Sequence, residues 1–188
     1  MKISILQESS ITLALYGLGL SHGLTSNTTF EEFCLNTELQ ERLYEVALKL
    51  APKGKGHNKF LESIQVWLEL QLPRYIWQDF STYRVGISTQ SEATNHTITK
   101  RILIQEDFDA PIPDFILEEV NRRIVNKDLI GVKDILPESF LQKRVLNVNY
   151  KCLQNILTQR KNHKLPQFQI ICKYLHQNLK YRELLKDA

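Results

Sequence analysis

The sequence has few cysteines and no clear metal-binding pattern. Its three cysteines, Cys34, Cys152 and Cys172, are widely spaced among 188 residues and cannot all pair. Small secreted domains usually carry an even set, so we expect reduced thiols and a cytoplasmic location. Only Cys172 and His176 have a metal-ligand spacing, and no second pair accompanies them. Because Cys172 falls on an apolar helical stripe, core packing is the better interpretation, and no metal site is predicted.

Long apolar runs and a strong charge imbalance are also absent. The opening residues lack a charged segment followed by an apolar core, so no secretory signal is predicted. The apolar run Ile11–Leu20 contains two glycines and is shorter than the ~20 residues that a membrane span needs. A net charge of +3 is too small to indicate binding to nucleic acid or a membrane. The composition is that of an ordinary globular chain, with one domain over residues 1–188.

Several common motifs are missing as well. The segment APKGKGH at 51–57 has glycines and lysines but neither the spacing nor the Ser/Thr of a P-loop, so a plain loop is predicted. The acidic stretch at 106–114 lacks the spacing of a calcium loop. No nucleophile-elbow or Cys/His catalytic signature is present. If the chain is an enzyme, its chemistry must therefore depend on a bound cofactor or a nucleotide pocket.

The hydrophobic pattern predicts an α+β fold. Strict alternation predicts a central strand over 63–72, with one core face and one mixed face that carries Trp67. Shorter strands are predicted over 2–6 and 98–104, and the C-terminal third is predicted to be helical. The predicted helices upstream of it are one capped by Ser9 or Ser10 and running through Leu20, one over 37–50, one starting at Pro73, and one from Pro113 to about Val125.

Residues 83–97, YRVGISTQSEATNHT, concentrate polar side chains. Such a stretch can be an exposed loop, in which Glu92 and Thr94 form a turn, or the lining of a nucleotide pocket. In a pocket, Arg84 is suited to charge-assisted hydrogen bonds with phosphate, and Glu92 and Thr94 to bonds with a ribose or a base edge.

Two parts of the chain resemble flavin-dependent thymidylate synthases. From Gly56 to Arg84 the chain follows that family's plan without a gap: a Gly-His pair, a glutamate, an alternating strand, a proline and a helix. Residues 91–97 then take the place of the family's nucleotide loop. The segment VNYKCLQNILTQR at 148–160 is similar to its pocket helix, and the chain also resembles a group of phage and prophage proteins. The resemblance implies the family's fold, a tetramer, and sites at subunit junctions.

The resemblance also implies two sets of ligand-binding residues, with FAD as the cofactor in question. For a nucleotide they are Arg84, Ser91, Glu92, Thr94, His96 and Arg160. For a cofactor they are His57, Asn149, Lys151 and Asn155. An alternative stays open for the pocket helix, because Asn149 can simply cap it and Arg160 can interact with its dipole.

Several residues that bind ligands in the family are replaced here. Thr82 and Tyr83 stand where an arginine and a histidine help to hold nucleotide and flavin, and Ser63 replaces a histidine near the flavin ring. Threonine cannot form the bidentate contacts of a guanidinium, and each lost charge-assisted bond costs about 1.5–3 kcal/mol. We therefore predict a nucleotide-binding protein with a repurposed pocket that modifies or sequesters a nucleotide, as a phage protein countering a host nucleotide signal would do in the host cytoplasm.

Two alternatives remain open. One is flavin-dependent methylation of dUMP to dTMP with methylenetetrahydrofolate and NADPH. The other is a non-catalytic assembly protein. We also predict a homo-oligomer, a tetramer on the resemblance, because Trp67 lies among polar residues on a strand face and the helix after Pro73 is rich in aromatic residues.

Overall fold

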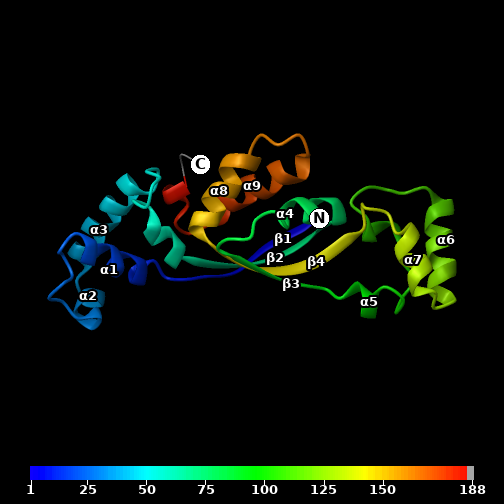
Figure 1. Ribbon diagram of the computed structural model, residues 1–188, viewed down its shortest axis with the longest axis horizontal. Helices are drawn as coiled ribbons and strands as arrows, with labels where there is room; N and C mark the ends of the chain where they lie inside the picture. The colour runs from blue at the N-terminus through cyan, green and yellow to red at the C-terminus, as the bar shows by residue number, and fades with distance from the viewer. Residues whose placement is uncertain (186–188) are drawn as a thin grey trace. The chain divides into compact units, whose positions relative to one another are not determined.

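The computed structural model describes residues 1–185 and has an α+β fold (Figure 1). Four strands form one sheet in the order β1-β2-β4-β3. The strands are β1 (Lys2–Glu8), β2 (Gln65–Pro73), β3 (Ile87–Ser91) and β4 (Leu141–Asn149). The predicted strand at 63–72 is confirmed as β2, and it lies inside the sheet. In β2, Val66, Leu68 and Leu70 are at most 2% exposed, whereas Trp67 is 37% exposed.

Hydrogen bonds at the strand ends show that β4 is antiparallel to both of its neighbours. Next to β2, the N–H of Arg74 donates to Phe140 and the N–H of Tyr150 donates to Ile64. Next to β3, the N–H of Glu92 donates to Lys143 and the N–H of Asn149 donates to Gly86. In each pair, the end of one strand meets the start of the other, as in an antiparallel ladder.

The chain divides into two compact units, which we describe separately. Unit 1 contains residues 1–4, 69–84 and 89–146, and unit 2 contains residues 5–68, 85–88 and the chain from Asn147 onward. Every strand begins in one unit and ends in the other. The single domain expected from chain length therefore stays a prediction.

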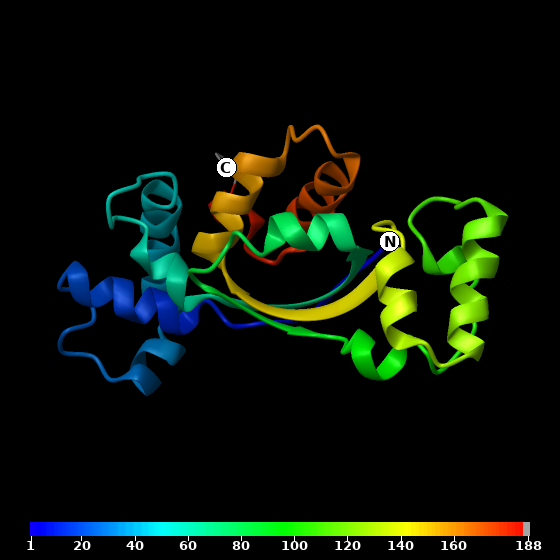
Figure 2. The ribbon, with the colours of Figure 1, turned by 45° about the vertical axis from the view of Figure 1, so that its right-hand side comes forward.

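Unit 1 contains the helices α4 (Arg74–Phe80), α5 (Thr94–Thr97), α6 (Asp114–Val125) and α7 (Leu129–Ile135). The predicted helix from Pro113 to Val125 is confirmed as α6, with Pro113 as its N-terminal cap. Helices α6 and α7 lie side by side in both ribbon views (Figures 1 and 2). They contribute to a core of eight buried residues: Ile98, Leu103, Phe108, Val120, Ile124, Val132, Leu136 and Phe140.

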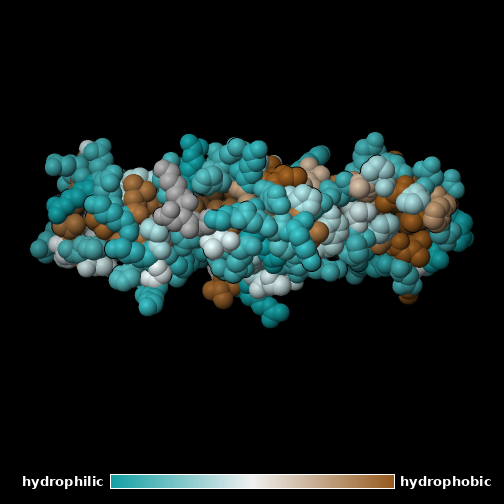
Figure 3. All heavy atoms as spheres, turned by 90° about the horizontal axis from the view of Figure 1, so that it is seen from above, coloured by the Kyte–Doolittle hydropathy of each residue, from teal (hydrophilic) through white to brown (hydrophobic). Residues whose placement is uncertain are grey.

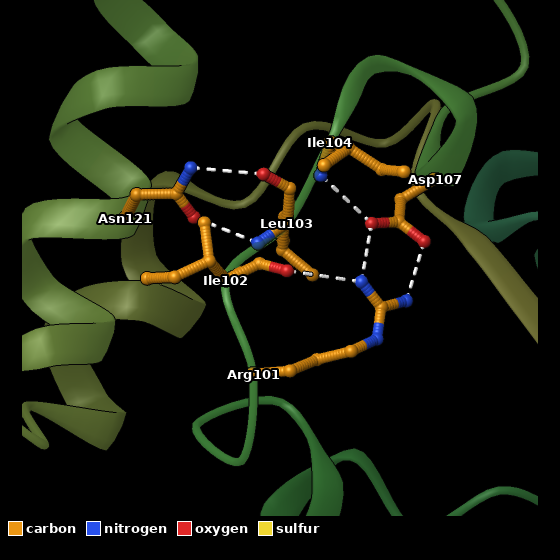
Figure 4. Close-up of polar contacts among 6 residues, drawn as sticks. All are labelled: Arg101, Ile102, Leu103, Ile104, Asp107 and Asn121. Carbon is orange, nitrogen blue, oxygen red and sulfur yellow. Dashed lines mark hydrogen bonds and ion pairs between the residues drawn. The ribbon is translucent and has the colours of Figure 1, made fainter.

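The predicted strand at 98–104 is wrong, because this segment has no strand pairing. Instead, the side-chain amide of Asn121 binds both backbone groups of Leu103, at 2.8 and 2.9 Å (Figure 4). Nearby, the guanidinium of Arg101 makes two bonds to the carboxylate of Asp107, at 2.7 and 2.5 Å. The side chain of Leu103 is buried in the unit 1 core. The apolar residue at this position is therefore explained by core packing and does not indicate a strand.

Two strands were not predicted. β3 lies within the polar segment 83–97 and is mostly exposed because it forms the edge of the sheet. β4 lies in the C-terminal third, so the helical prediction is wrong there. Along β4 the buried positions Leu141, Leu146 and Val148 do not alternate regularly, and the period-2 signal of a strand is therefore weak.

Up to Leu185, where the described residues end, unit 2 contains five helices longer than one turn, besides 3₁₀ turns at Lys59–Ser63 and Arg182–Leu185. They are α1 (Thr12–Ser21), α2 (Phe30–Leu35), α3 (Thr37–Leu50), α8 (Tyr150–Arg160) and α9 (Pro166–Asn178). The bounds of α3 match the prediction, and α8 and α9 lie side by side (Figure 2). The predicted cap by Ser9 or Ser10 is wrong in position, since Ile11 occupies the cap without a side-chain bond, although Oγ of Ser10 accepts from the N–H of Thr12 at 3.2 Å. Within residues 1–185, no helix has the length and apolar character to cross a membrane.

Candidate functional site

The segment that carries Ser91, Glu92, Thr94 and His96 is fixed to β4 in unit 1. The N–H of Glu92 donates to the carbonyl of Lys143 at 3.0 Å. The carbonyl of Glu92 accepts from the Thr94 N–H at 3.1 Å, so this stretch is a tight turn at the start of α5. The side chains of Ser91, Glu92 and His96 are exposed, and Thr94 is half-buried. The turn expected for a loop is therefore present, and it directs Thr94 inward.

Thr94 lies in a small hollow of about 90 Å³. The ammonium group of Lys133, from α7, donates to the hydroxyl of Thr94 at 3.2 Å. Arg74 also lines the hollow, where it pairs with Glu138 at 3.1 Å. The remaining lining residues are Ile98, Leu136 and Gln142. A water molecule occupies about 30 Å³ of liquid, so this volume suits an anion of phosphate size and excludes a whole nucleoside.

The sequence indicated Thr94 but not Lys133 or Arg74. Lys133 lies 39 residues from Thr94 along the chain, and no local motif connects them. Their proximity depends on the packing of α7 against the unit 1 core, through the buried Val132. Arg84, the residue predicted to bind phosphate, follows α4, is exposed, and does not line this hollow.

A larger cavity of about 540 Å³ lies in unit 2. Its wall from α1 is largely apolar and includes Ala14 and Gly17, and a Cβ built on Gly17 meets no atom within 4 Å. Its polar lining includes His57, whose predicted role in binding a cofactor stays a prediction, and Ser63, which stands where the family has a histidine. Glu62, the glutamate of the family's plan, lines it too, as do three residues that the sequence did not indicate: His22, Lys59 and, at the end of α1, Ser21. The volume falls in the range of ligand pockets, roughly 300–1,000 Å³.

Lys151 is bonded inside unit 2. Its ammonium group donates to Oδ1 of Asn58 at 2.6 Å. The amide nitrogen of Asn58, a residue only 2% exposed, donates to the Ala51 carbonyl and to Gln154, both at 3.0 Å. Lys151 therefore stabilises the loop that carries His57, and a cofactor contact by Lys151 stays a prediction.

The other residues of the predicted pocket helix also have internal partners. Asn149 caps α8, because its Oδ1 accepts from the Cys152 N–H at 2.8 Å. Asn155 is exposed and accepts from Gln159 at 2.9 Å. Arg160 ends α8 and lies 4.7 Å over the ring of Phe168. The capping alternative thus describes Asn149, and the ligand roles of these residues stay predictions.

The buried thiols are unsuited to nucleophilic chemistry. Burial raises the pKa of both Cys152 and Cys172 to about 11, so both stay protonated near neutral pH. Cys172 is 4% exposed and packs in the core, as predicted. In the part of the chain that the structure describes, no three His, Cys, Asp or Glu side chains are grouped to hold a metal ion.

Solved structures with the same arrangement of elements identify the fold. The flavin-dependent thymidylate synthase ThyX from Helicobacter pylori, complexed with FAD and dUMP, matches with a TM-score of 0.77 and 17% identity, over 100% of this chain and 99% of that chain. A second ThyX structure from the same organism, also with FAD and dUMP, gives 0.75 and 17%, over 99% of this chain and 100% of that one. The UMP/dUMP methylase PolB from Streptomyces cacaoi, bound with 5-Br dUMP, gives 0.67 and 11%, over 94% and 88%.

No family model matches this sequence, and no curated protein does. The structural matches define the fold class of the protein as the α+β fold that it shares with ThyX and PolB. More particularly, the chain has the fold of flavin-dependent thymidylate synthases over its whole length, as the sequence resemblance implied.

Proposed function

We propose that the protein binds a nucleotide and holds its phosphate group in the unit 1 hollow. The observation that carries the proposal is the approach of Lys133 to Thr94, a cation and a hydroxyl at 3.2 Å on the turn predicted as the nucleotide loop. An ammonium and a hydroxyl can both donate to phosphate oxygens. Each charge-assisted bond contributes about 1.5–3 kcal/mol, so Lys133 can substitute for the guanidinium group missing at Thr82.

The rest of the nucleotide extends beyond the hollow, which is too small for a nucleoside. The exposed side chains of Ser91, Glu92 and His96 follow or precede Thr94 by only a few residues and are available to a ribose or base. Arg84 is exposed in the same unit and is a further candidate for the phosphate. The fold supports this assignment, because the neighbours ThyX and PolB were solved with dUMP and 5-Br dUMP.

The unit 2 cavity fits a flat ring with polar edges, such as the flavin of FAD. Ala14 and Gly17 leave one wall open, and Lys59 and His57 can donate to phosphate or carbonyl oxygens. The carboxylate of Glu62 can accept from a ring N–H. A bound flavin supplies hydride transfer. Methylation of dUMP is therefore the second candidate function, and this cavity is the observation that favours it.

We infer in addition that copies of the chain associate. Exposed apolar side chains gather in unit 1, in the region where Figure 1 places α6 and α7 (Figure 3). They include Phe115, Val125 and Ile130, which are 69–74% exposed. Two aromatic residues of α4, Trp77 and Phe80, no longer support this inference, because both are buried within the unit itself. Trp67 keeps its supporting role, since it is 37% exposed.

Titration of the purified protein with dUMP tests the proposal. Lys133→Met is expected to weaken binding by about ten- to a hundredfold, the loss of one charge-assisted contact. The control is Lys49→Met, which removes an exposed lysine of α3 and is expected to bind as the wild type does. Equal affinity in both variants, or no binding by the wild type, would overturn the proposal.

The absorbance spectrum and the contents of denatured protein separate the candidate functions. Yellow protein with flavin absorbance supports the methylase. Colourless protein that releases a nucleotide supports a protein that sequesters it, including a phage protein that counters a host nucleotide signal. Protein with neither, which also fails to bind added dUMP, supports the assembly protein.

A further inference from the structure

Within unit 1, both the oxygen and the nitrogen of the Gln142 side-chain amide, in β4, form hydrogen bonds. Its Oε1 accepts from Nε and Nη2 of Arg144, at 3.2 and 2.8 Å. Its Nε2 donates to the carbonyl oxygen of Glu92 at 3.0 Å. Gln142 also lines the hollow that contains Thr94. A single amide therefore connects β4 to the turn that carries the proposed phosphate ligand.

Arg144 determines which way this amide points. A guanidinium has only donors, so the amide atom that faces it must be the oxygen. The amide nitrogen then faces Glu92, whose carbonyl can only accept. Arg144 itself is held by Trp77, since its guanidinium carbon lies 4.5 Å from the centroid of that ring. Trp77 is 2% exposed and donates its indole N–H to the Gln142 carbonyl at 2.8 Å, which makes it a fixed support.

The Glu92 carbonyl is the point at which Gln142 can influence Thr94. Glu92 is bonded to β4 on both sides, through its N–H to Lys143 and through its carbonyl to Gln142. The same carbonyl accepts from the N–H of Thr94 at 3.1 Å. Without the Gln142 bond, one of the two β4 bonds of Glu92 is lost, and the turn that places the Thr94 hydroxyl is free to shift.

We propose that Gln142, oriented by Arg144, is a positioning residue of the nucleotide site. It fixes the carbonyl of Glu92, and this sets the hydroxyl of Thr94 where that hydroxyl and Lys133 meet a phosphate together. The inference rests on the proposed function. Arg144 does not line the hollow and acts only through Gln142.

The test is a double-mutant cycle measured by dUMP titration. Gln142→Met keeps the length and neutral charge of the side chain but cannot donate to Glu92, and is expected to weaken binding by about three- to tenfold, the loss of one neutral hydrogen bond. In a Lys133→Met background the same change is expected to have little further effect, because both residues act on one phosphate contact. Arg144→Lys, which keeps the charge, is expected to weaken binding in the same direction.

The matched control is Lys143→Met. Lys143 is the neighbour of both residues in β4, pairs with Glu69 at 2.7 Å, and meets Glu92 through its backbone alone, so its variant is expected to bind dUMP as the wild type does. Amide hydrogen exchange at Thr94 is expected to speed up in Gln142→Met and to stay unchanged in Lys143→Met. Wild-type affinity in Gln142→Met, or losses that add fully in the double variant, would overturn the inference alone. No dUMP binding by the wild type, or none lost in Lys133→Met, would remove the proposed function first.

Discussion

Substitution of Asn58 by alanine is expected to destabilise the protein strongly, because Asn58 joins the loop before β2 to α8. The side chain is 2% exposed and makes three hydrogen bonds, one to the ammonium of Lys151 and two to neutral groups. A bond to a charged group contributes about 1.5–3 kcal/mol and a neutral one about 0.5–1.5 kcal/mol. The Ala51 carbonyl keeps a second donor, Nε2 of Gln154 at 2.9 Å, which limits the loss there.

These contributions give a loss of about 3 kcal/mol in the free energy of unfolding. For a chain of this size, 1 kcal/mol corresponds to about 2–4 °C in melting temperature, so Asn58→Ala is expected to lower it by roughly 6–12 °C. Thermal unfolding followed by circular dichroism measures this shift. Asn155→Ala is the control, because Asn155 is exposed and an exposed substitution usually changes stability by about 0.5 kcal/mol or less.

The same experiment distinguishes two roles for Lys151. If Lys151 stabilises the loop, Lys151→Met lowers the melting temperature by leaving Oδ1 of Asn58 without its donor. If Lys151 instead serves a cofactor, its variant changes ligand affinity and leaves the melting temperature near that of the wild type. A melting temperature for Asn58→Ala within about 2 °C of the control would show that the buried hydrogen bonds of Asn58 contribute little to stability.

Three further predictions follow from the structure. Gly86→Ala is expected to lower the free energy of unfolding in urea by about 1–3 kcal/mol, because Gly86 has φ +74° and a Cβ would lie 2.5 Å from the Asn149 side chain. The control is Gly17→Ala, whose Cβ meets nothing within 4 Å and which is expected to leave stability unchanged or raised. Burial raises the pKa of Asp107, but bonds from Arg101 and the backbone outweigh this and lower it. The stability that Asp107 contributes is therefore present above its unfolded pKa of about 3.9 and lost as pH falls through its lower folded pKa, so wild type and Asp107→Asn should converge in acid unfolding. Light scattering should give a multiple of 22.0 kDa, and a mass of one chain would contradict the oligomer.

Local patterns in the sequence predicted the elements whose signals are local. α3 has its predicted bounds, and β2 has the predicted alternation, since in both cases one face meets the core along the whole element. Two segments differ from the prediction for a physical reason: 87–91 is a strand that was not predicted, and 98–104 was predicted as a strand but is not one. The first is an edge strand with few buried residues, and the second is buried but bonded by the side chain of Asn121. A periodicity in apolar residues reports burial, and in these two segments burial and strand pairing do not coincide.

In the candidate site, too, the sequence indicated the residues that are adjacent in the chain but not those that folding brings together. The polar turn with Thr94 was visible in the sequence because its residues are adjacent. Lys133 and Gln142 were not, because only the packing of α7 and the pairing of β4 bring them to that turn. The resemblance predicted that α8 lines a ligand pocket, which stays a prediction, and in the structure Asn149 and Lys151 are used internally, as a helix cap and as support for a loop.

A crystal structure of the protein with dUMP would show directly whether the unit 1 hollow binds the phosphate group. We expect phosphate oxygens within hydrogen-bonding distance of Nζ of Lys133 and Oγ1 of Thr94, with the base outside the hollow. A structure in which dUMP is bound and its phosphate contacts neither Lys133 nor Thr94 would contradict this expectation.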